Sequence, residues 1–460
     1  MSTKQCSDCS GSYPDDVDGP SRRLAALVSW PAAPLTDSLV RRALTDIGQV
    51  EISPSLPTLP LSSKLLQWAA YDTIDHSLTV TEPNRVLSSA YTIRKALIRK
   101  HFFARCTRSY ILKHPQSVLA TSVPRTWDIE MSFAHELDEL WHDELWDLGE
   151  ELETSPGRWY ILKPGMADAG MGIRLFNSKD TLREIFEEFE GHSDDEEAES
   201  CDTFVITSQL RHFVIQEYVA NPLLIDPREF LPGSHVKATE RLRGRKFHLR
   251  TYVVASGVLR VYMYRRMLAL FSCEPYDFPR RGNNESSISL LPHLTNTSLQ
   301  SRRGEEGVRL FDELIGHHIL SGIEGNINLL EPDIADIREQ MAQILADVFK
   351  AATEQAIHFQ PLPNAFELYG VDFLVSHVPS GSHGPRFQVN ILEVNAEPAI
   401  ELTGPRLTWI LEDLFKSIQV VCIAPFADGV SDQIDSWKVG EVRHNMQKCL
   451  DMQVRGAMGW

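Results

Sequence analysis

The sequence predicts a multi-domain α/β protein. The chain has 460 residues, and at roughly 100–200 residues per domain this length leaves room for two to four domains. Its composition, 43% hydrophobic and 23% charged, is ordinary for a globular protein. Segments with strand and helix periodicity alternate along the chain, without an internal repeat. These observations argue against a fibrous or wholly disordered protein.

Charge and cysteine content narrow the functional class. Lys and Arg total 45 against 63 Asp and Glu, which gives a net charge of −18. A general nucleic-acid binder needs a basic surface, so we expect no nucleic-acid partner. Seven scattered cysteines fit a reducing compartment. No apolar run is long enough to span a membrane, and residues 1–18 lack the apolar core of a secretory signal. We therefore expect a cytoplasmic protein without a membrane partner.

The first part of the chain gives weak structural signals. We predict a disordered tail over residues 1–20, where Cys6 and Cys9 lack the second pair that a zinc site needs. Residues 21–90 predict a small α/β domain. The basic stretch Ser88–Phe103 predicts a helix, and the apolar spacing within Met131–Leu148 predicts an acidic amphipathic helix.

After Pro156 strand patterns dominate. Single strands are predicted at Arg158–Lys163, Gly172–Phe176 and Phe213–Val219. Two strand pairs are predicted, Phe247–Val254 with Gly257–Tyr264 and Leu368–Val375 with Phe387–Val394. Helices are predicted at Thr181–Glu190, Ile334–Ile357 and Thr403–Val421, and the acidic Glu187–Glu199 indicates a solvated insertion.

A possible magnesium site lies at the end of the last predicted strand. Strand alternation would place Phe387, Val389, Ile391, Glu393 and Asn395 on one side. Asp372 lies on the predicted partner strand. Two carboxylates and an amide oxygen suit Mg²⁺, which takes one or two carboxylates together with nucleotide phosphates. The alternative is that acids at strand ends simply face water.

Two further segments could bind a nucleotide. The strand Trp159–Lys163 delivers Lys163 into a loop of small residues that ends at Gly170-Met171-Gly172. Such loops can bind phosphate through backbone N–H groups, although an ordinary hairpin would have the same pattern. The apolar strand Phe213–Val219 turns polar at its end, where backbone groups could contact an adenine edge. An ordinary core strand is the alternative.

The most basic segment is Gly244–Arg250. Alternation puts Lys246, His248 and Arg250 on one strand face, where they repel one another unless an anion lies against them. A triphosphate or an acidic acceptor would fit there. A solvated basic strand is the alternative.

These segments, in this order, resemble the tubulin–tyrosine ligase family of ATP-grasp ligases. The resemblance covers about residues 90–425. The matching segments are Trp159–Gly172, Gln216–Val219 followed by Asn221–Leu224, Arg245–Arg250, Gly257–Tyr264 with Glu274–Tyr276, the tetrapeptide His293-Leu294-Thr295-Asn296, Phe366–Phe373 and Leu392–Pro398. It implies an ATP-grasp fold of three α/β domains, with the nucleotide between the central and C-terminal domains. We accordingly expect an N-terminal domain at 21–90, a central domain at 91–238 and a C-terminal domain at 239–460.

The resemblance also implies roles for individual residues. Lys163 would contact ATP phosphates, as could Lys95, and Lys246 would lie near the nucleotide. Gln216, Glu217 and Val219 would form the adenine hinge. Arg250 would orient phosphate or the acceptor carboxylate, and Asn296 would lie close to the reacting groups. The resemblance assigns Mg²⁺ to the ligand set named above, Asp372, Glu393 and Asn395.

The implied activity is ATP-dependent ligation of an amino acid, tyrosine or glutamate, to a protein carboxylate through an acyl phosphate. The expected partners are a free amino acid and tubulin or another protein with an acidic tail. Three departures favour an alternative, a catalytically weak or inactive nucleotide-binding interaction module. His248 replaces a usual Asp, Ala169 stands where a basic residue is frequent, and Leu270 replaces a second arginine for which Arg265 or Arg266 could substitute.

Overall fold

The computed structural model describes most of the chain. The described residues are 24–48, 50–57, 63–155, 157–165, 171–191, 211–229, 241–280, 288–295, 307–322, 327–378, 385–429 and 432–453. The predicted tail, Cys6, Cys9, Ala169, Asn296 and most of the acidic segment Glu187–Glu199 lie outside these residues.

The N-terminal unit is a four-stranded parallel sheet with strand order β2-β1-β3-β4. Its strands are β1 (Leu24–Ser29), β2 (Val50–Ser53), β3 (Lys64–Ala69) and β4 (Val86–Ser88). Parallel strands need crossover connections. Here these contain α1 (Pro34–Thr45), between β1 and β2, and α2 (His76–Thr81), between β3 and β4. This sheet and its helices lie within residues 21–90, where the sequence predicted a small α/β domain, and their core is shared with the large sheet.

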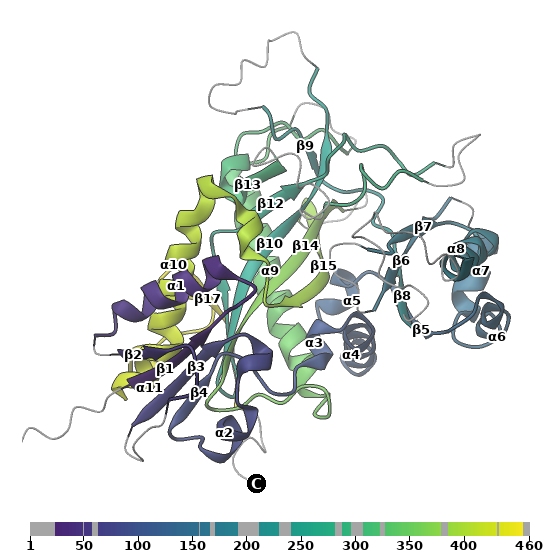
Figure 1. Cartoon of the computed structure of the whole chain (residues 1–460). Helices are drawn as coiled ribbons and strands as arrows, with labels where there is room; N and C mark the ends of the chain where they lie inside the picture. The colour runs from purple at the N-terminus through teal and green to yellow at the C-terminus, as the bar shows by residue number, and fades with distance from the viewer. Residues whose placement is uncertain are drawn as a thin grey trace, which may run out of the picture.

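A second, antiparallel sheet has the order β5-β8-β6-β7. Its strands are β5 (Thr126–Glu130), β6 (Tyr160–Pro164), β7 (Arg174–Phe176) and β8 (His212–Glu217). The helices α6 (Leu137–Leu140), α7 (Trp146–Thr154) and α8 (Lys179–Gly191) contribute to its hydrophobic core. Figure 1 shows this lobe standing apart from the N-terminal sheet.

The largest sheet has nine strands in the described residues, and β10 (Arg245–Ser256) is its centre. β10 pairs with four strands: β9 (Leu224–Ile225), β11 (Arg260–Tyr264), β12 (Leu268–Phe271) and β14 (Phe366–His377). The outer strands are β13 (Val308–Leu310), β15 (Phe387–Ala396), β16 (Val442–Arg443) and β17 (Met446–Asp451). Both predicted strand pairs, β10–β11 and β14–β15, are confirmed.

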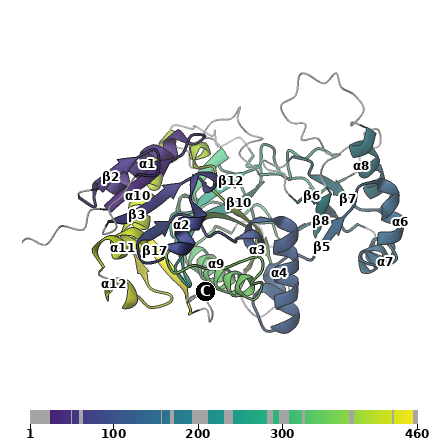
Figure 2. The same ribbon diagram turned by 60° about the horizontal axis from the view of Figure 1, so that its bottom comes forward.

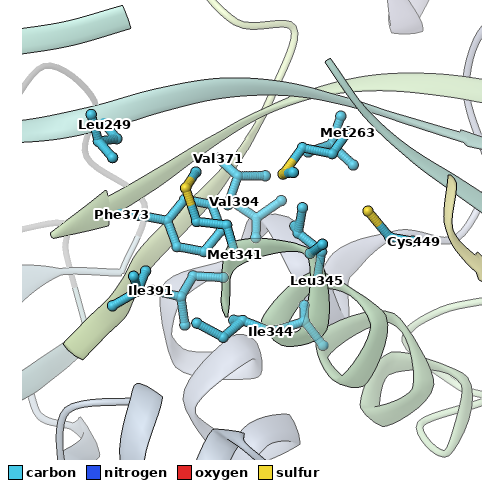
Figure 3. Close-up of a cluster of buried hydrophobic side chains, with 14 of the residues drawn as sticks. Leu249, Met263, Met341, Ile344, Leu345, Val371, Phe373, Ile391, Val394 and Cys449 are labelled. Atoms are coloured by element: carbon cyan, nitrogen blue, oxygen red, sulfur yellow. The ribbon is translucent and has the colours of Figure 1, made fainter. Parts of the chain in front are cut away.

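Alternation along β10 gives the large sheet two buried faces. Phe247, Leu249 and Val253 join the core formed with α9 (Glu331–Thr353), α3 (Lys95–Ile98) and α4 (Lys100–Lys113). Tyr252 and Val254 pack instead with α10 (Thr408–Ile418) and the N-terminal sheet. Figure 2 shows α9 beside α3 and α4, away from α1 and α10. Figure 3 shows Met341, Ile344 and Leu345 of α9 lying against Val371, Phe373 and Ile391 of the sheet.

The remaining described helices are short. They are η1 (Tyr71–Thr73), α5 (Leu119–Ser122), η2 (Ala134–Glu136), η6 (Phe311–Leu314), η7 (Ile400–Thr403), η8 (Pro405–Leu407), the π-helix η9 (Gln419–Ile423), α11 (Ala424–Asp428) and α12 (Asp432–Asp435). The helix predicted over Thr403–Val421 is therefore η8, α10 and part of η9. The helix predicted over Met131–Leu148 is divided into η2, α6 and the first turn of α7.

The predicted helix at Ser88–Phe103 begins later than expected. Helical structure starts only at Lys95, because the backbone before it makes hydrogen bonds across the fold. The N–H of Ser88 donates to the carbonyl of Asn364, and the N–H of Tyr91 donates to the Glu367 carboxylate. This segment therefore connects the N-terminal unit to β14 instead of forming a helical turn.

The packing also differs from the predicted start of the central domain at residue 91. Leu97, Phe103, Tyr110 and Leu119 belong to the core shared with α9, not to the core of the antiparallel lobe. The segment from α3 to α5 is therefore attached to the large sheet, and the lobe begins with β5.

We expect Met341→Ala to lower the free energy of unfolding by about 2–5 kcal/mol, because it leaves a cavity at a fully buried position. Urea denaturation measures the change. Gln343→Ala, at an exposed position on the same helix, is the control, with an expected change within about 0.5 kcal/mol. Equal losses in both variants would contradict the position assigned to α9.

Candidate active site

A cleft lies where the antiparallel lobe meets β10, β14 and β15. Its lining contains most of the residues singled out from the sequence. Seven of them line it directly: Lys163, Gln216, Glu217, Val219, Lys246, Asp372 and Glu393. An adjoining smaller cavity shares Lys163, Gln216 and Glu393 with the cleft and adds Asn395. Segments that lie far apart in the sequence therefore meet at one place.

The two carboxylates lie opposite each other on neighbouring strands. Asp372 of β14 pairs in register with Glu393 of β15. The next register pair is Phe373 with Ile391, so Leu392 is an extra residue in β15. A β-bulge of this kind re-aims the side chains that follow it.

This bulge corrects the predicted strand face. Ile391 and Val394 both point into the hydrophobic core, whereas Glu393 lines the cleft. Strict alternation would instead have put Ile391 on the same side as Glu393. Asn395 remains beside Glu393, and its amide donates to the Glu393 carboxylate at 3.3 Å. The predicted ligand oxygens therefore lie together. Because of the bulge, they face the cleft and the adjoining cavity while Ile391 and Val394 face the core.

Arg250 and Asp372 form a buried pair across β10 and β14. They are directly opposite in register, and the guanidinium donates to both carboxylate oxygens, with Nη2 to Oδ2 at 2.8 Å. Burial opposes the charge on Arg250, but the field of Asp372 outweighs it and raises the pKa of the guanidinium. Arg250 is therefore permanently charged at the edge of the cleft.

His248 occupies the position where an Asp was expected. Its Nδ1 lies 2.5 Å from the Thr295 hydroxyl, and its Nε2 lies 3.5 Å from Oδ1 of Asp372. Burial lowers the pKa of His248, so the neutral imidazole is favoured. Tyr218 and His293 make a second such contact, from the Tyr218 hydroxyl to Nδ1 at 2.9 Å. Two hydrogen bonds thus fasten the segment that leads to Asn296.

Three lysines approach the cleft from three elements. Lys163 ends β6 and donates to the Gln216 side chain at 2.8 Å. Nζ of Lys246, on β10, lies 4.3 Å from the centre of the Tyr218 ring. Lys100, which begins α4, lies 3.5 Å from the Glu393 carboxylate.

Their electrostatics indicate a site for an anion. Burial, with Lys100 adding to it, lowers the pKa of Lys163 to about 8. Burial and the nearby Lys163 lower the pKa of Lys246 to about 7. Burial alone would raise the pKa of Glu393, but Lys100 and Lys163 outweigh it and bring that pKa to about 2. Burial and mutual repulsion destabilise the charged forms of these lysines. A polyanion bound between them would stabilise the charged forms.

Some sequence expectations are not met in the cleft. Lys95 is exposed and lines neither cavity, whereas Lys100, five residues later, lines the smaller cavity that adjoins the cleft. The basic character of Arg94–Lys100 was visible in the sequence, but which lysine reaches the cleft depends on where the helix begins. The Gln216 side chain lines both cavities, where it accepts from Lys163 and donates to Thr126, and its contact with adenine stays a prediction.

Arg265 and Arg266 do not replace the arginine missing at Leu270. Leu270 is buried in β12 directly opposite His248. Arg265 and Arg266 follow β11, where Arg265 donates to Gln447 and Arg266 pairs with Asp413 at 3.2 Å. Neither lines the cleft. Arg265 and Arg266 lie in the turn before β12, at the Arg250–Leu268 end of the β10–β12 pair, whereas Lys246 lies beyond the opposite end.

The oxygen set fits Mg²⁺ with nucleotide phosphates better than a metal held by protein alone. Within the described residues, no group of three His, Cys, Asp or Glu side chains is arranged to hold a metal ion. Two carboxylates and one amide oxygen would leave about half of the octahedral positions of Mg²⁺ to phosphates and water. Lys100, Lys163 and Lys246 would neutralise part of the phosphate charge.

The three-unit α/β fold with this cleft is that of an ATP-grasp protein. The chain belongs to the tubulin-tyrosine ligase family, which matches residues 81–429. A solved structure, that of the C-terminal domain of K. lactis Pby1, superposes with a TM-score of 0.63 at 28% identity, covering 94% of this chain and 99% of that one. That protein is described as an ATP-grasp enzyme interacting with the mRNA decapping enzyme Dcp2.

Two curated relatives cover most of the chain. The probable tubulin–tyrosine ligase C12B10.04 of Schizosaccharomyces pombe is 37% identical, over 78% of this chain and 83% of its own length. The probable tubulin–tyrosine ligase PBY1 of Saccharomyces cerevisiae is 34% identical over 92% of this chain. The match spans only 54% of the length of that relative.

We expect Lys100→Ala to weaken Mg-ATP binding at least about tenfold, since it removes a cation beside Glu393. Lys95→Ala, which deletes the same side chain at an exposed position on α3, should leave the affinity unchanged. Isothermal titration calorimetry measures both. A larger loss in the Lys95 variant would favour the sequence-based assignment over the observed geometry.

Nucleotide binding should also take up protons above neutral pH. Lys246 loses its proton near pH 7 in the free protein, and a bound triphosphate favours the charged form, so its pKa should rise on binding. Calorimetry at pH 8 in two buffers with different ionisation enthalpies should therefore show net proton uptake. Lys246→Arg should remove the part of the uptake that belongs to Lys246, because arginine stays charged, and leave the smaller part that belongs to Lys163. Proton release by the wild-type protein would contradict this assignment.

Proposed function

We propose that this protein is an ATP-dependent carboxylate–amine ligase that joins an amino acid, tyrosine or glutamate, to a protein carboxylate. The single observation that supports it most is that Lys163 and Lys246 line one cleft with Asp372 and Glu393, while Arg250 pairs with Asp372 and Lys100 with Glu393. A phosphoryl-transfer site needs this combination of cations for charge and oxygen ligands for a metal. Membership of the tubulin-tyrosine ligase family supports the same reaction class.

The proposed chemistry needs no covalent nucleophile on the protein. The substrate carboxylate attacks the terminal phosphate of ATP, which gives an acyl phosphate and releases ADP. The amine of the amino acid then attacks the acyl carbon and displaces phosphate to form an amide. Lys163 and Lys246 would stabilise the phosphate charge, and Arg250 would orient the carboxylate. Asp372, Glu393 and Asn395 would hold Mg²⁺, which supplies charge neutralisation at the phosphates. The Gln216–Val219 segment would border the adenine, next to the apolar Ile161, Ile173 and Leu374.

The acceptor we propose is a protein tail, with a tubulin tail as the first candidate because of the names of the relatives. An acidic tail would be attracted by the cleft lysines. Arg245, in the basic segment Gly244–Arg250, donates to the Ser272 and Cys273 carbonyls, and Arg266 pairs with Asp413. The attraction would therefore depend on the cleft lysines more than on these two arginines.

A second function is favoured by one specific observation. The Pby1 domain of similar fold is described as interacting with a decapping enzyme. An interaction module that binds nucleotide and a decapping partner in the cytoplasm would be compatible with His248 and Leu270. Free cysteines at all four described cysteine positions fit that reducing compartment. Within the described residues, no helix has the length and apolar character to cross a membrane.

Incubation with Mg-ATP, labelled tyrosine or glutamate and a tubulin-containing cell extract tests the two functions. ATP-dependent transfer of label to protein supports the ligase. Absence of transfer, together with co-purification of a decapping enzyme from the same extract, supports the module. Lys163→Ala is the negative control for transfer.

We expect Glu393→Gln to lower ligase turnover at least about 100-fold and to raise the magnesium concentration needed for half-maximal rate. The change keeps the size of the side chain but removes a charge from the proposed metal site. Asp347→Asn on α9, away from both cavities, is the control. Full turnover of the Glu393 variant at limiting magnesium would contradict the role of Glu393.

A further inference from the structure

Helix α4 lies at the joint between the antiparallel lobe and the large sheet. Through Phe103, Cys106 and Tyr110 it packs into the core shared with α9. Phe213 and Ile215 of β8 belong instead to the core of the lobe. Figures 1 and 2 both show α4 beside β5 and β8. The side chains between α4 and these two strands therefore help to hold the lobe against the large sheet.

Two histidine rings stack on each other across this joint. The rings of His101, on α4, and His212, which begins β8, are inclined by only 14°, with their centres 4.5 Å apart. His101 is 4% exposed. Nδ1 of each ring is buried and has no hydrogen-bond partner within the described residues, although the His212 atom lies 3.8 Å from the Glu130 carboxylate. A proton added to Nδ1 of His101 would find no acceptor among these residues, so the contact favours a neutral ring.

The surroundings of His101 oppose a positive charge on it. Burial is the largest of the effects that together lower its pKa to about 4. The positive charges of His212, Arg105 and Arg99 lower the pKa further, and the Asp128 carboxylate of β5 opposes them. Because the ordinary pKa of histidine is about 6.5, His101 is neutral at neutral pH as long as the lobe stays in contact with α4.

The histidine pair lies against the strand that carries Lys163. Gly165, two residues beyond Lys163, donates its N–H to the His212 carbonyl at 2.7 Å. A Cβ at Gly165 would lie 2.9 Å from Nδ1 of His101, so the backbone approaches this ring closely. Lys100, the residue before His101, lines the smaller cavity together with Lys163. A change in the histidine contact would therefore move Lys163 relative to Lys100.

We propose that the stacked histidines form an acid-sensitive latch, which holds the lobe against α4 at neutral pH and releases it when His101 is protonated. Two adjacent imidazolium rings repel each other, and the buried ring lacks solvation. Release would separate Lys163 of the lobe from Lys100 and Glu393, so the nucleotide site is complete only when the latch is closed. This last consequence rests on the proposed function, whereas the latch itself does not.

The closed latch weakens as the pH falls. His101 has a pKa of about 4 in the closed latch, and its pKa returns to the ordinary value of about 6.5 when release exposes the ring to water. The contribution of His101 to closure is therefore complete above about pH 6.5 and is lost as the pH falls towards about 4. Between pH 7.5 and pH 5.5, these two pKa values raise the ratio of open to closed latch about tenfold.

Chemical labelling of an introduced cysteine tests the latch without nucleotide. Val214 of β8 is buried, pairs with Lys163 and lines the smaller cavity with Phe103 of α4. Val214→Cys therefore places a thiol that a methanethiosulfonate reagent reaches when the joint opens. Its labelling rate, divided by that of a cysteine peptide at the same pH, should rise about tenfold from pH 7.5 to pH 5.5. The native buried Cys106 and Cys449 report opening of the large-sheet core, and their normalised rates should not change.

Further variants in the Val214→Cys protein assign the response to His101. His101→Phe keeps a ring against His212, and His101→Gln keeps a polar side chain, but neither can be protonated. In both, the change between the two pH values should fall below about twofold. His114→Gln, at an exposed position at the end of the same helix, is the matched control and should keep the tenfold response. A Val214→Cys protein without a pH response, or an undiminished response in both His101 variants, would refute the latch.

Addition of Mg-ATP to the same samples separates the latch from the proposed function. We expect Mg-ATP to slow the labelling at pH 5.5, because a bound nucleotide would hold Lys163 and Lys100 together. Labelling that Mg-ATP slows but that does not depend on pH contradicts the latch and leaves the nucleotide site standing. A tenfold pH response that Mg-ATP does not reduce supports the latch and contradicts the nucleotide site.

Discussion

The Arg250–Asp372 pair is the interaction on which the arrangement of the site depends most. It joins the two longest strands of the large sheet at positions directly opposite in register. Both groups are largely removed from water, so loss of either partner would leave an uncompensated charge at a cost of about 3–5 kcal/mol. The pair also fixes the Asp372 carboxylate opposite Glu393, and it keeps a permanent cation beside these acids. Strand register and site chemistry are therefore set by the same contact.

The cleft brings two buried lysines together with the carboxylates of Glu217, Asp372 and Glu393. Lys163 and Lys246 have lowered pKa values mainly because both are buried; Lys100 lowers that of Lys163 further, and Lys163 lowers that of Lys246. Such a site is stabilised by a bound polyanion, and its geometry is already in place before binding. Preorganised charge of this kind costs little reorganisation during phosphoryl transfer. The unfavourable burial of Lys163 and Lys246 is offset by favourable interactions elsewhere in the fold.

Much of the architecture could be predicted from local patterns. The strand pairs β10–β11 and β14–β15 and helix α9 follow from periodicity and turn residues, and the motif order indicated the ATP-grasp fold. Non-local contacts account for the differences. The helix at Ser88–Phe103 starts late because the backbone at Ser88 and Tyr91 bonds to residues near β14. That shift brings Lys100, and not Lys95, to Glu393. The contact of His248 with Thr295 joins residues 47 positions apart, and no local pattern reports it.

The bulge at Leu392 divides β15 into two segments of opposite phase. Before it, odd-numbered residues such as Val389 and Ile391 fill the core, and after it the even-numbered Val394 does so. Substitutions of core residues before Leu392 therefore leave unchanged which residues after it face the cleft. A single insertion or deletion between the bulge and Asn395 would exchange the two faces and place a carboxylate in the core. In related chains, a one-residue break in strand parity just before an acidic residue would mark the position of the same site.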